Sequence, residues 1–344
     1  MRAPNQRVLA ALAGVCQTTV SLALRGDPSI PEATRDHIRR VAEKAGYRPN
    51  PQVASLMAQI RRGRKTTARG CIAFLADAAD REEWLDRDYV CRQREGMVAR
   101  AAELGYRTEA FYLRGRGMSV ERLDRVLHAR GIRAVVLAGP KRSDVDLSGM
   151  RWRDYACATI SYTWDMPVDR VSSHHRHNMD LVLGELEARG YRRIGLSLRP
   201  HEVAAVDRNW LSGLLVMQQR LPASRRLPPF VGEHEPGSLP AFAAWMEKWK
   251  PDVLISLTGW EERWLKRLGL RAPTDIGHVC LNRPDGSSFA GVEEDHAFIG
   301  STVIELLVAQ VNRNDYGIPV RPRLTLIDGR WREGDTLRPR PGRG

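Results

Sequence analysis

The stretch that decides the N-terminal fold is VLAALAGVCQTTVSLAL, residues 8–24. Its first six residues form an apolar helical pattern that ends at Gly14, a residue that tolerates a left-handed turn. A second helical pattern covers 17–24, where Val20 and Leu24 are four residues apart and are expected to face inward. That register leaves four side chains on the outer face: Gln17, Thr18, Ser21 and Leu22. Two short helices around a glycine-containing turn predict a helix-turn-helix unit.

A third helix is expected to begin near Pro31. Proline at the first helical position and Glu32 in the first turn are both helix-start signals. Apolar residues then recur at a spacing of three to four along 34–45, and Gly46 ends the pattern. The sequence therefore predicts a small all-α headpiece over residues 1–50.

Positive charge is concentrated at the N-terminus. Residues 1–69 contain 13 Lys and Arg against 4 Asp and Glu, whereas the remaining residues contain 41 against 37. A basic end on a nearly neutral body is typical of a nucleic-acid-binding arm. By itself the charge also fits a solvated surface or a membrane-surface helix. No apolar run is long enough to span a bilayer and no signal peptide is recognised, so a cytoplasmic location is expected.

Cysteine and histidine give no clear metal signature. The five cysteines are scattered and form no Cys-x-x-Cys pair. We therefore expect reduced thiols, and we predict no disulfide and no zinc site. The run 174–177, His-His-Arg-His, is interpreted as a solvated loop just before a helix, with Asn178 near the helix cap. Metal binding by this run is the less favoured alternative. No metal and no cofactor are predicted.

From Gly70 onward, strand-like and helix-like segments alternate. This alternation predicts a mostly parallel sheet with helices on both faces. The sequence has no Gly-x-Gly-x-x-Gly motif after a strand and no phosphate-binding loop, which argues against a nucleotide-dependent enzyme. The predicted strands lie near 71–75, 108–112, 134–137, 158–161, 193–198, 252–257 and 277–281, and the predicted helices include 89–104 and 179–189.

An ordered string of short motifs in the headpiece resembles the lactose-repressor (LacI-type) family of bacterial transcription regulators. The motifs are LAGV at 12–15, TVS at 19–21, Leu24, PEATR at 31–35 and AGYRPNP at 45–51. Looser landmarks, GYRRIG at 190–195 and APTDI at 272–276, extend the resemblance over essentially the whole chain. The resemblance implies a DNA-binding regulator, a repressor, that binds a pseudo-palindromic double-stranded operator as a homodimer and responds to a small effector such as a carbohydrate.

The resemblance also assigns DNA-binding positions. It implies that Gln17, Thr18 and Leu22 meet base edges, while Thr19 and Ser21 contact phosphate. The predicted set further includes Arg25, Tyr47, Asn50 and Leu56. Leu56 would be the wedge of a hinge helix that pairs in the minor groove; packing against the core is its alternative role. Because Cys16 and Leu22 stand where the family usually has Ser and Arg, the operator sequence is not carried over.

The resemblance divides the chain into a headpiece (1–50), a hinge helix and linker (51–69) and a core (70–344). The core is expected to hold two doubly wound parallel-sheet subdomains of the periplasmic-binding-protein-like type. The N-subdomain would cover about 70–163 and 289–320, and the C-subdomain about 164–288 and 321–344. The chain would cross between them near residues 164, 288 and 321.

The effector is expected between the subdomains, because ligands bind at the carboxyl ends of parallel strands. This placement predicts eight effector-binding residues: Asp77, Ser161, Tyr162, Trp164, Trp210, Thr258, Trp260 and Asn282. Trp210 and Trp260 could stack on an apolar sugar face, and core packing of either ring is an equally open alternative.

Two other functions remain alternatives. A small-molecule-binding protein without specific DNA regulation would explain the core and not the basic headpiece. An enzyme would have to use Glu293, Glu294 and Asp295 or the histidine run, and no nucleophile–base spacing supports that. The sequence therefore favours a regulator and predicts no catalytic residue.

Overall fold

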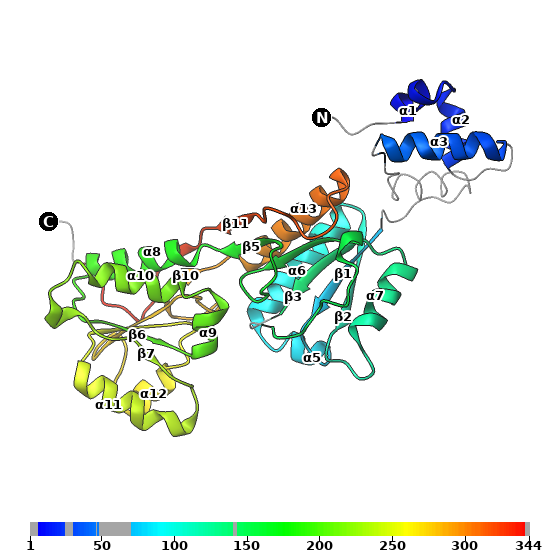
Figure 1. The fold of residues 1–344 in the computed structure, drawn as a ribbon. Helices are drawn as coiled ribbons and strands as arrows, with labels where there is room; N and C mark the ends of the chain where they lie inside the picture. The colour runs from blue at the N-terminus through cyan, green and yellow to red at the C-terminus, as the bar shows by residue number, and fades with distance from the viewer. Residues whose placement is uncertain (1–5, 25–29, 46, 48–69, 140–142, 341–344) are drawn as a thin grey trace. The chain divides into compact units, whose positions relative to one another are not determined.

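The computed structural model describes residues 6–24, 30–45, 47, 70–139 and 143–340 (Figure 1). The chain forms two compact units, residues 1–69 and residues 70–344. Among the described helices, none combines the length and the apolar character that crossing a membrane requires.

The first unit contains the three predicted helices. They are α1 (Gln6–Ala13), α2 (Gln17–Leu24) and α3 (Glu32–Lys44). Gly14 has a φ of 67°, so the predicted left-handed turn between α1 and α2 is confirmed. Leu9, Val20 and Ile38, one from each helix, are fully buried against one another in a small core. The helix-turn-helix headpiece therefore has its own apolar centre.

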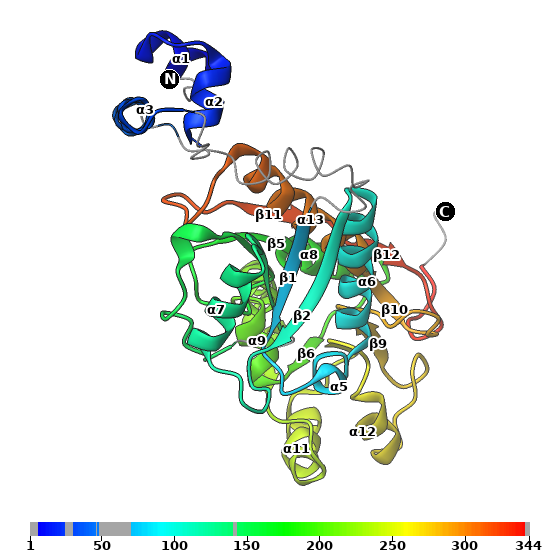
Figure 2. The same ribbon diagram turned by 90° about the vertical axis from the view of Figure 1, so that its right-hand side faces the viewer.

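The second unit begins with a six-stranded sheet in the order β11-β5-β4-β3-β1-β2, in which neighbouring strands run parallel. Its central strands are apolar runs buried on both faces, as parallel sheets require. Helices α6 (Asp88–Glu103) and α13 (His296–Arg313) lie over one face, and α7 (Val120–Ala129) lies over the other (Figure 2). The strands are β1 (Gly70–Ala76), β2 (Tyr106–Tyr112), β3 (Ala134–Ala138), β4 (Ala156–Ile160), β5 (Asp169–Ser173) and β11 (Leu324–Ile327).

The other sheet has the order β12-β10-β9-β8-β6-β7, and β12 alone among its described strands runs antiparallel to its neighbour. In Figure 1, α8 (His175–Ala188) and α10 (Asn209–Gln218) cover one face, while α11 (Leu239–Trp249) and α12 (Glu262–Arg267) cover the other. The strands are β6 (Ile194–Leu198), β7 (Phe230–Val231), β8 (Val253–Ser256), β9 (Gly277–Cys280), β10 (Ala290–Glu293) and β12 (Arg330–Arg332). The short helices α5 (Arg81–Trp84) and α9 (Pro200–Ala205) complete the unit, with single 3₁₀ turns at Trp152–Asp154, Ala223–Arg225 and Pro236–Ser238.

The two predicted parallel-sheet subdomains are confirmed, but the crossings lie later than expected. The strand β5 belongs to the first sheet, β10 to the second, and β11 to the first again. The chain therefore crosses near residues 174, 294 and 328, and the predicted crossings near 164, 288 and 321 are wrong. Each of these strands extends its own sheet before the chain leaves it. Polar β5 (DRVSS) and half-exposed β11 gave no strong strand pattern.

Helices α6 and α13 pack at unusually close range through glycine. A Cβ atom added at Gly300 would lie 2.0 Å from the backbone oxygen of Gln93, and one added at Gly96 would lie 1.9 Å from the backbone oxygen of Ala297. Backbone cannot move aside as a flexible side chain can, so both positions require glycine while the helices keep this approach.

We expect Gly300→Ala to lower the free energy of unfolding by about 1–3 kcal/mol or more, because the added methyl group overpacks the α6–α13 contact. Gly184→Ala is the matched control, since Gly184 is exposed within α8 and nothing lies within 4 Å of its added Cβ. That change should stabilise by about 0.5–1 kcal/mol through helix propensity. Urea unfolding of both variants measures the difference, and equal effects of the two substitutions would contradict the close approach.

Candidate functional site

The first candidate site is the outer face of α2 in the headpiece. Gln17 and Thr18 are exposed, whereas Thr19, Ser21 and Leu22 are half-buried. Val20 is buried in the headpiece core as predicted; Ala23 is buried beside it, and Leu24, also predicted to face inward, is only partly buried against the core. Tyr47 packs against the headpiece core. The remaining predicted DNA-binding residues, Arg25, Asn50 and Leu56, lie outside the described residues.

Cys16 occupies the position just before α2. Its carbonyl accepts from Val20 N at 3.2 Å, and its Sγ lies 3.1 Å from Thr19 Oγ1. Hydrogen bonds from the side chain and the backbone of Thr19 lower the pKa of this exposed thiol. The cysteine thus contacts the same groups that a capping serine would reach.

The second candidate site is a cavity of about 440 Å³ between the two subdomains of the second unit. It lies beyond the carboxyl ends of strands from both sheets. Ile160 ends β4 of the first sheet and Ser161 follows it, while Leu257 and Thr258 follow β8 of the second. This is where parallel α/β sheets hold their ligands.

Four of the eight predicted effector-binding residues line this pocket: Ser161, Trp210, Thr258 and Asn282. The hydroxyl of Ser161 donates to the carbonyl of Ala205 in α9, 3.2 Å away, and so links the two subdomains. Trp210 lies on α10 and is only 4% exposed, yet its indole N–H has no hydrogen-bond partner among the described residues. A buried donor of this kind is normally satisfied, so an acceptor on a bound molecule or a water would complete it.

The other four predicted residues lie outside the pocket lining and have structural partners instead. Asp77 is buried and accepts from Arg114 Nε at 2.8 Å. Trp164 is buried in the apolar core between the first sheet and α7. The rings of Trp260 and His234 are stacked with centroids 5.1 Å apart, and Tyr162 lies under the guanidinium of Arg170. For Trp164 and Trp260, packing is the role that the structure displays.

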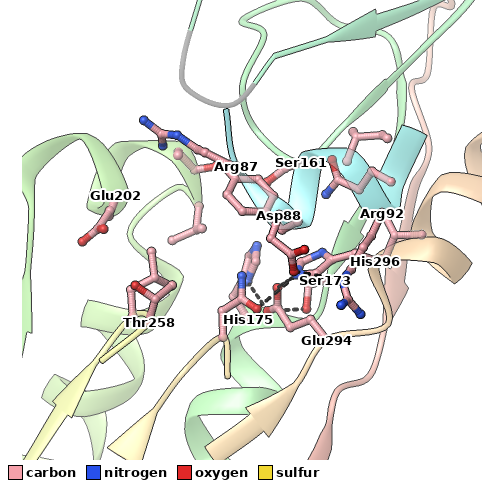
Figure 3. Close-up of a pocket in the computed structure, with 18 of the residues that line it drawn as sticks. Arg87, Asp88, Arg92, Ser161, Ser173, His175, Glu202, Thr258, Glu294 and His296 are labelled. Atoms are coloured by element: carbon pink, nitrogen blue, oxygen red, sulfur yellow. Dashed lines mark hydrogen bonds and ion pairs between the residues drawn. The ribbon is translucent and has the colours of Figure 1, made fainter. Parts of the chain in front are cut away.

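A buried carboxylate, Glu294, forms the centre of a polar network at one side of the pocket (Figure 3). Ser173 Oγ donates to its Oε1 at 2.6 Å, and Asn178 Nδ2 donates to the same oxygen at 3.0 Å. His175 Nδ1 lies 3.3 Å from Oε1, and His296 Nε2 lies 3.8 Å from Oε2. Figure 3 shows Ser173, His175 and His296 gathered around Glu294, with Glu202 and Thr258 at the opposite side of the pocket.

This Glu294 network joins all three crossings. Ser173 and His175 flank the first crossing, Glu294 forms the second, and Asn178 Oδ1 accepts from Gly329 N of the third at 2.9 Å. The histidine run is therefore not a loop before a helix, as predicted: α8 begins at His175, and Asn178 lies buried inside it. The reason is that Asn178 N already donates to the carbonyl of His174, which starts the helix earlier.

Burial and the network act on Glu294 in opposite directions. Burial raises the pKa of this carboxyl, but the charge and hydrogen bond of His175, the charge of His296 and the hydrogen bond of Ser173 outweigh it and lower the pKa to about 2. Burial lowers the pKa of His296. Glu294 is therefore an anion and an acceptor at neutral pH, and its donors fix where the three crossing segments meet.

Charged side chains around the pocket are paired with one another. Arg92 of α6 binds Asp88 at 2.9 Å and also binds Asp285, which lies between β9 and β10 of the other subdomain. Arg199 Nε donates to Glu202 Oε1 at 2.8 Å. The Arg92–Asp285 pair, like the Ser161 hydroxyl, connects the two subdomains across the pocket.

The Glu294 network was not predicted from the sequence as a binding-site feature, and Glu294 was considered only as a catalytic alternative. Ser173 is the last residue of β5, and Glu294 directly follows β10. The rule that predicted Ser161 and Thr258 would have found them. It could not be applied because neither strand was predicted.

We expect Glu294→Gln to destabilise the protein by about 3 kcal/mol at pH 7, because the surrounding groups stabilise the carboxylate and a neutral amide cannot replace it as an acceptor. The carboxyl has its ordinary pKa near 4.5 when unfolded and about 2 when folded. The wild-type advantage should therefore be full above that ordinary pKa and shrink as the pH falls toward 2. Urea unfolding across this pH range measures it.

Glu293→Gln is the control for this variant. Glu293 pairs with the half-exposed Arg332 at 2.7 Å, and a pair of this kind contributes about 0–1 kcal/mol. If the two glutamine variants lost equal stability, or if the loss at Glu294 did not depend on pH, the buried network would not have the role assigned to it.

Comparisons with known proteins agree with both parts of the chain. Residues 9–50 match the family model described as bacterial regulatory proteins, lacI family. No curated protein matches the sequence. A transcriptional regulator CelR–cellobiose complex is 19% identical, with a TM-score of 0.59, over 97% of this chain and 99% of that chain.

Two further solved structures have the same fold. The lac repressor dimer bound to operator and the anti-inducer ONPF is 18% identical, with a TM-score of 0.59, over 97% of this chain and 99% of that chain. A LacI family transcriptional regulator from Enterococcus faecium with bound ribose is 13% identical, with a TM-score of 0.56, over 78% of this chain and 98% of that chain. Residues 9–50 thus match the lacI family of bacterial regulatory proteins, and the chain has the fold of the solved lacI-type regulators.

Proposed function

We propose that this protein is a sequence-specific DNA-binding transcription regulator, a repressor, whose DNA affinity is set by a small sugar-like effector in the pocket between the core subdomains. It would act as a homodimer in the cytoplasm, because a pseudo-palindromic operator requires two-fold symmetry. The observation that carries the proposal is the headpiece of residues 9–50, with the outer face of α2 free of the headpiece core.

The DNA-binding role rests on α2 and on the charge of its unit. Gln17 and Thr18 project from the start of α2, the part of a recognition helix that reaches base edges in the major groove. Leu22 offers an apolar surface that suits a thymine methyl group rather than guanine. The 13 Lys and Arg of residues 1–69 supply phosphate contacts. Thr19, Ser21, Arg25, Tyr47, Asn50 and Leu56 remain proposed contacts of the same interface.

The effector role rests on the pocket. Its volume of about 440 Å³ suits a small molecule. Four arginines line it: Arg87, Arg92 and Arg199 are paired with carboxylates, and Arg283 donates to backbone carbonyls. A neutral polar ligand therefore fits better than a strongly charged one. Trp210 offers a ring face with an unpaired N–H, and Thr258 and Asn282 offer polar groups for hydroxyls. Solved structures of the same fold contain cellobiose and ribose.

Regulation follows from the position of this pocket beside the three crossings. A ligand that contacts both subdomains binds one arrangement of them better than another and so shifts their equilibrium. Binding energy at the pocket would reach the headpiece only through such a shift, and linkage requires the effect to be reciprocal.

We assign the pocket to binding rather than to catalysis. Glu294 is a buried acid in the pocket lining and is the candidate for a catalytic acid. Ser173, Asn178 and His175 already contact its Oε1. Its lowered pKa leaves it without a proton to donate at neutral pH. The second candidate function, a small-molecule-binding protein without specific DNA regulation, does not explain the lacI-type headpiece.

We expect selection from a pool of random DNA duplexes to enrich a pseudo-palindromic site for the full chain. Gln17→Ala should weaken binding to that site by about 1–3 kcal/mol, because it removes contacts to base edges, and should leave binding to unrelated DNA unchanged. His37→Ala, exposed on α3, is the control and should bind as wild type. Binding that is salt-sensitive and independent of sequence would overturn the proposal.

We also expect a panel of neutral mono- and disaccharides to include a ligand that raises the melting temperature. A ligand at about 100 times its Kd stabilises the folded state by about 2.7 kcal/mol. Trp210→Phe keeps an aromatic ring but removes the buried N–H together with the five-membered ring that bears it, so it should weaken this ligand by about 1–3 kcal/mol. Trp260→Phe is the control, since Trp260 lies outside the pocket lining. Equal ligand shifts in the two variants would contradict the role of the Trp210 N–H.

A further inference from the structure

Two histidines and an aspartate meet on the surface where the first and third crossings run side by side. His174 Nδ1 lies 2.7 Å from Asp328 Oδ1, and the rings of His174 and His177 are stacked with centroids 5.4 Å apart. One ligand atom from each of the three residues lies within 4.8 Å of the others. None of the three belongs to the lining of the effector pocket.

We propose that His174, His177 and Asp328 form a binding site for a divalent transition-metal ion such as Zn²⁺. Two imidazoles with one carboxylate are a donor set that suits zinc, nickel, cobalt or copper and not magnesium or calcium. Three protein ligands leave one or more coordination positions for water. This site is separate from the effector pocket and does not depend on the proposed function.

The backbone fixes where these three side chains start. β5 and β11 pair in parallel with Ser173 opposite Ile327, and His174 N donates to the carbonyl of Ile327 at 2.8 Å. His174 and Asp328 are therefore the next residues after a paired ladder. His177 follows one turn into α8, and residues three apart lie on the same side of a helix.

The distances require only side-chain adjustment. Zinc lies about 2.0–2.2 Å from imidazole nitrogen and carboxylate oxygen, so two ligand atoms around it lie about 3.3 Å apart. One ligand atom from each of the three residues lies within 4.8 Å of the others, so the site needs shifts of about 1–2 Å among these side chains. His177 is half-buried and Asp328 is exposed, so both side chains have room to rotate.

A bound ion would connect Asp328 in the third crossing to His174 and His177 at the first. His174 adjoins His175 of the Glu294 network, so the ion would hold the crossing segments on the surface while Glu294 holds them in the interior. Metal binding should therefore stabilise the core by mass action.

The test is isothermal titration of Zn²⁺ into the full chain, prepared without a histidine tag and stripped with a chelator, with Co²⁺ absorption as the second readout. We expect one ion per chain, at least tenfold weaker binding in both His177→Ala and Asp328→Asn, and wild-type binding in the control His37→Ala. The Co²⁺ spectrum should show no thiolate charge-transfer band, which separates this site from the five cysteines.

Unfolding curves without metal establish that each variant is folded, and two independent variants keep the test open if one of them is not. Equal affinity in the wild type and in both variants, a thiolate band, or no binding by the wild type would overturn the proposal. None of these results would bear on DNA binding, which is measured separately.

Discussion

In the described core, the carboxylate of Glu294 lies where the chain passes between the subdomains three times. Its burial there is tolerated only because hydrogen-bond and charge partners surround it. Ser173, Asn178 and His175 hold one of its oxygens, and Asn178 in turn accepts from the backbone of Gly329. An unpaired anion at this depth would cost several kcal/mol. The network therefore fixes the relative positions of three chain segments that are distant in sequence. The shape of the pocket beside the network depends on these positions.

The pocket depends on this constraint because its two walls come from different subdomains. Ile160 and Ser161 belong to one wall, while Leu257 and Thr258 belong to the other. Besides the crossings, the Arg92–Asp285 pair and the Ser161–Ala205 hydrogen bond connect these walls. Exposed ion pairs contribute little, so a ligand with modest differential affinity is sufficient to favour one arrangement of the walls.

The three described helices of the headpiece could be predicted from the sequence, whereas half of the predicted pocket residues lie elsewhere. In the headpiece, Gly14 and the spacing of Val20 and Leu24 are local signals, and local spacing decides which side of a short helix is buried. Parallel strands with continuous apolar runs, such as β3, could also be predicted from the sequence. The strand β5 is polar, β11 is half-exposed and β10 is only four residues long, and the pairing of all three depends on partners far away in sequence. For that reason Ser173, His175 and Glu294 were missed as pocket residues, and the crossings were placed too early.

The same dependence on distant partners decides the roles of the tryptophans. The sequence left stacking and packing equally open for Trp210 and Trp260, and only three-dimensional neighbours separate the two. Trp210 lines the pocket, while Trp260 stacks on His234. Asp328 likewise contacts His174 because of a strand pairing that no local pattern predicts.

If the pocket ligand and DNA act through one change in the core, their binding must be linked. The most direct measurement is a closed thermodynamic cycle on the full chain. It compares the Kd for the selected operator with and without saturating effector, and the Kd for the effector with and without operator. We predict that both ratios are equal and differ from one by a factor of about 5–150. Ratios of one in both directions, with each ligand binding well alone, would contradict this regulation.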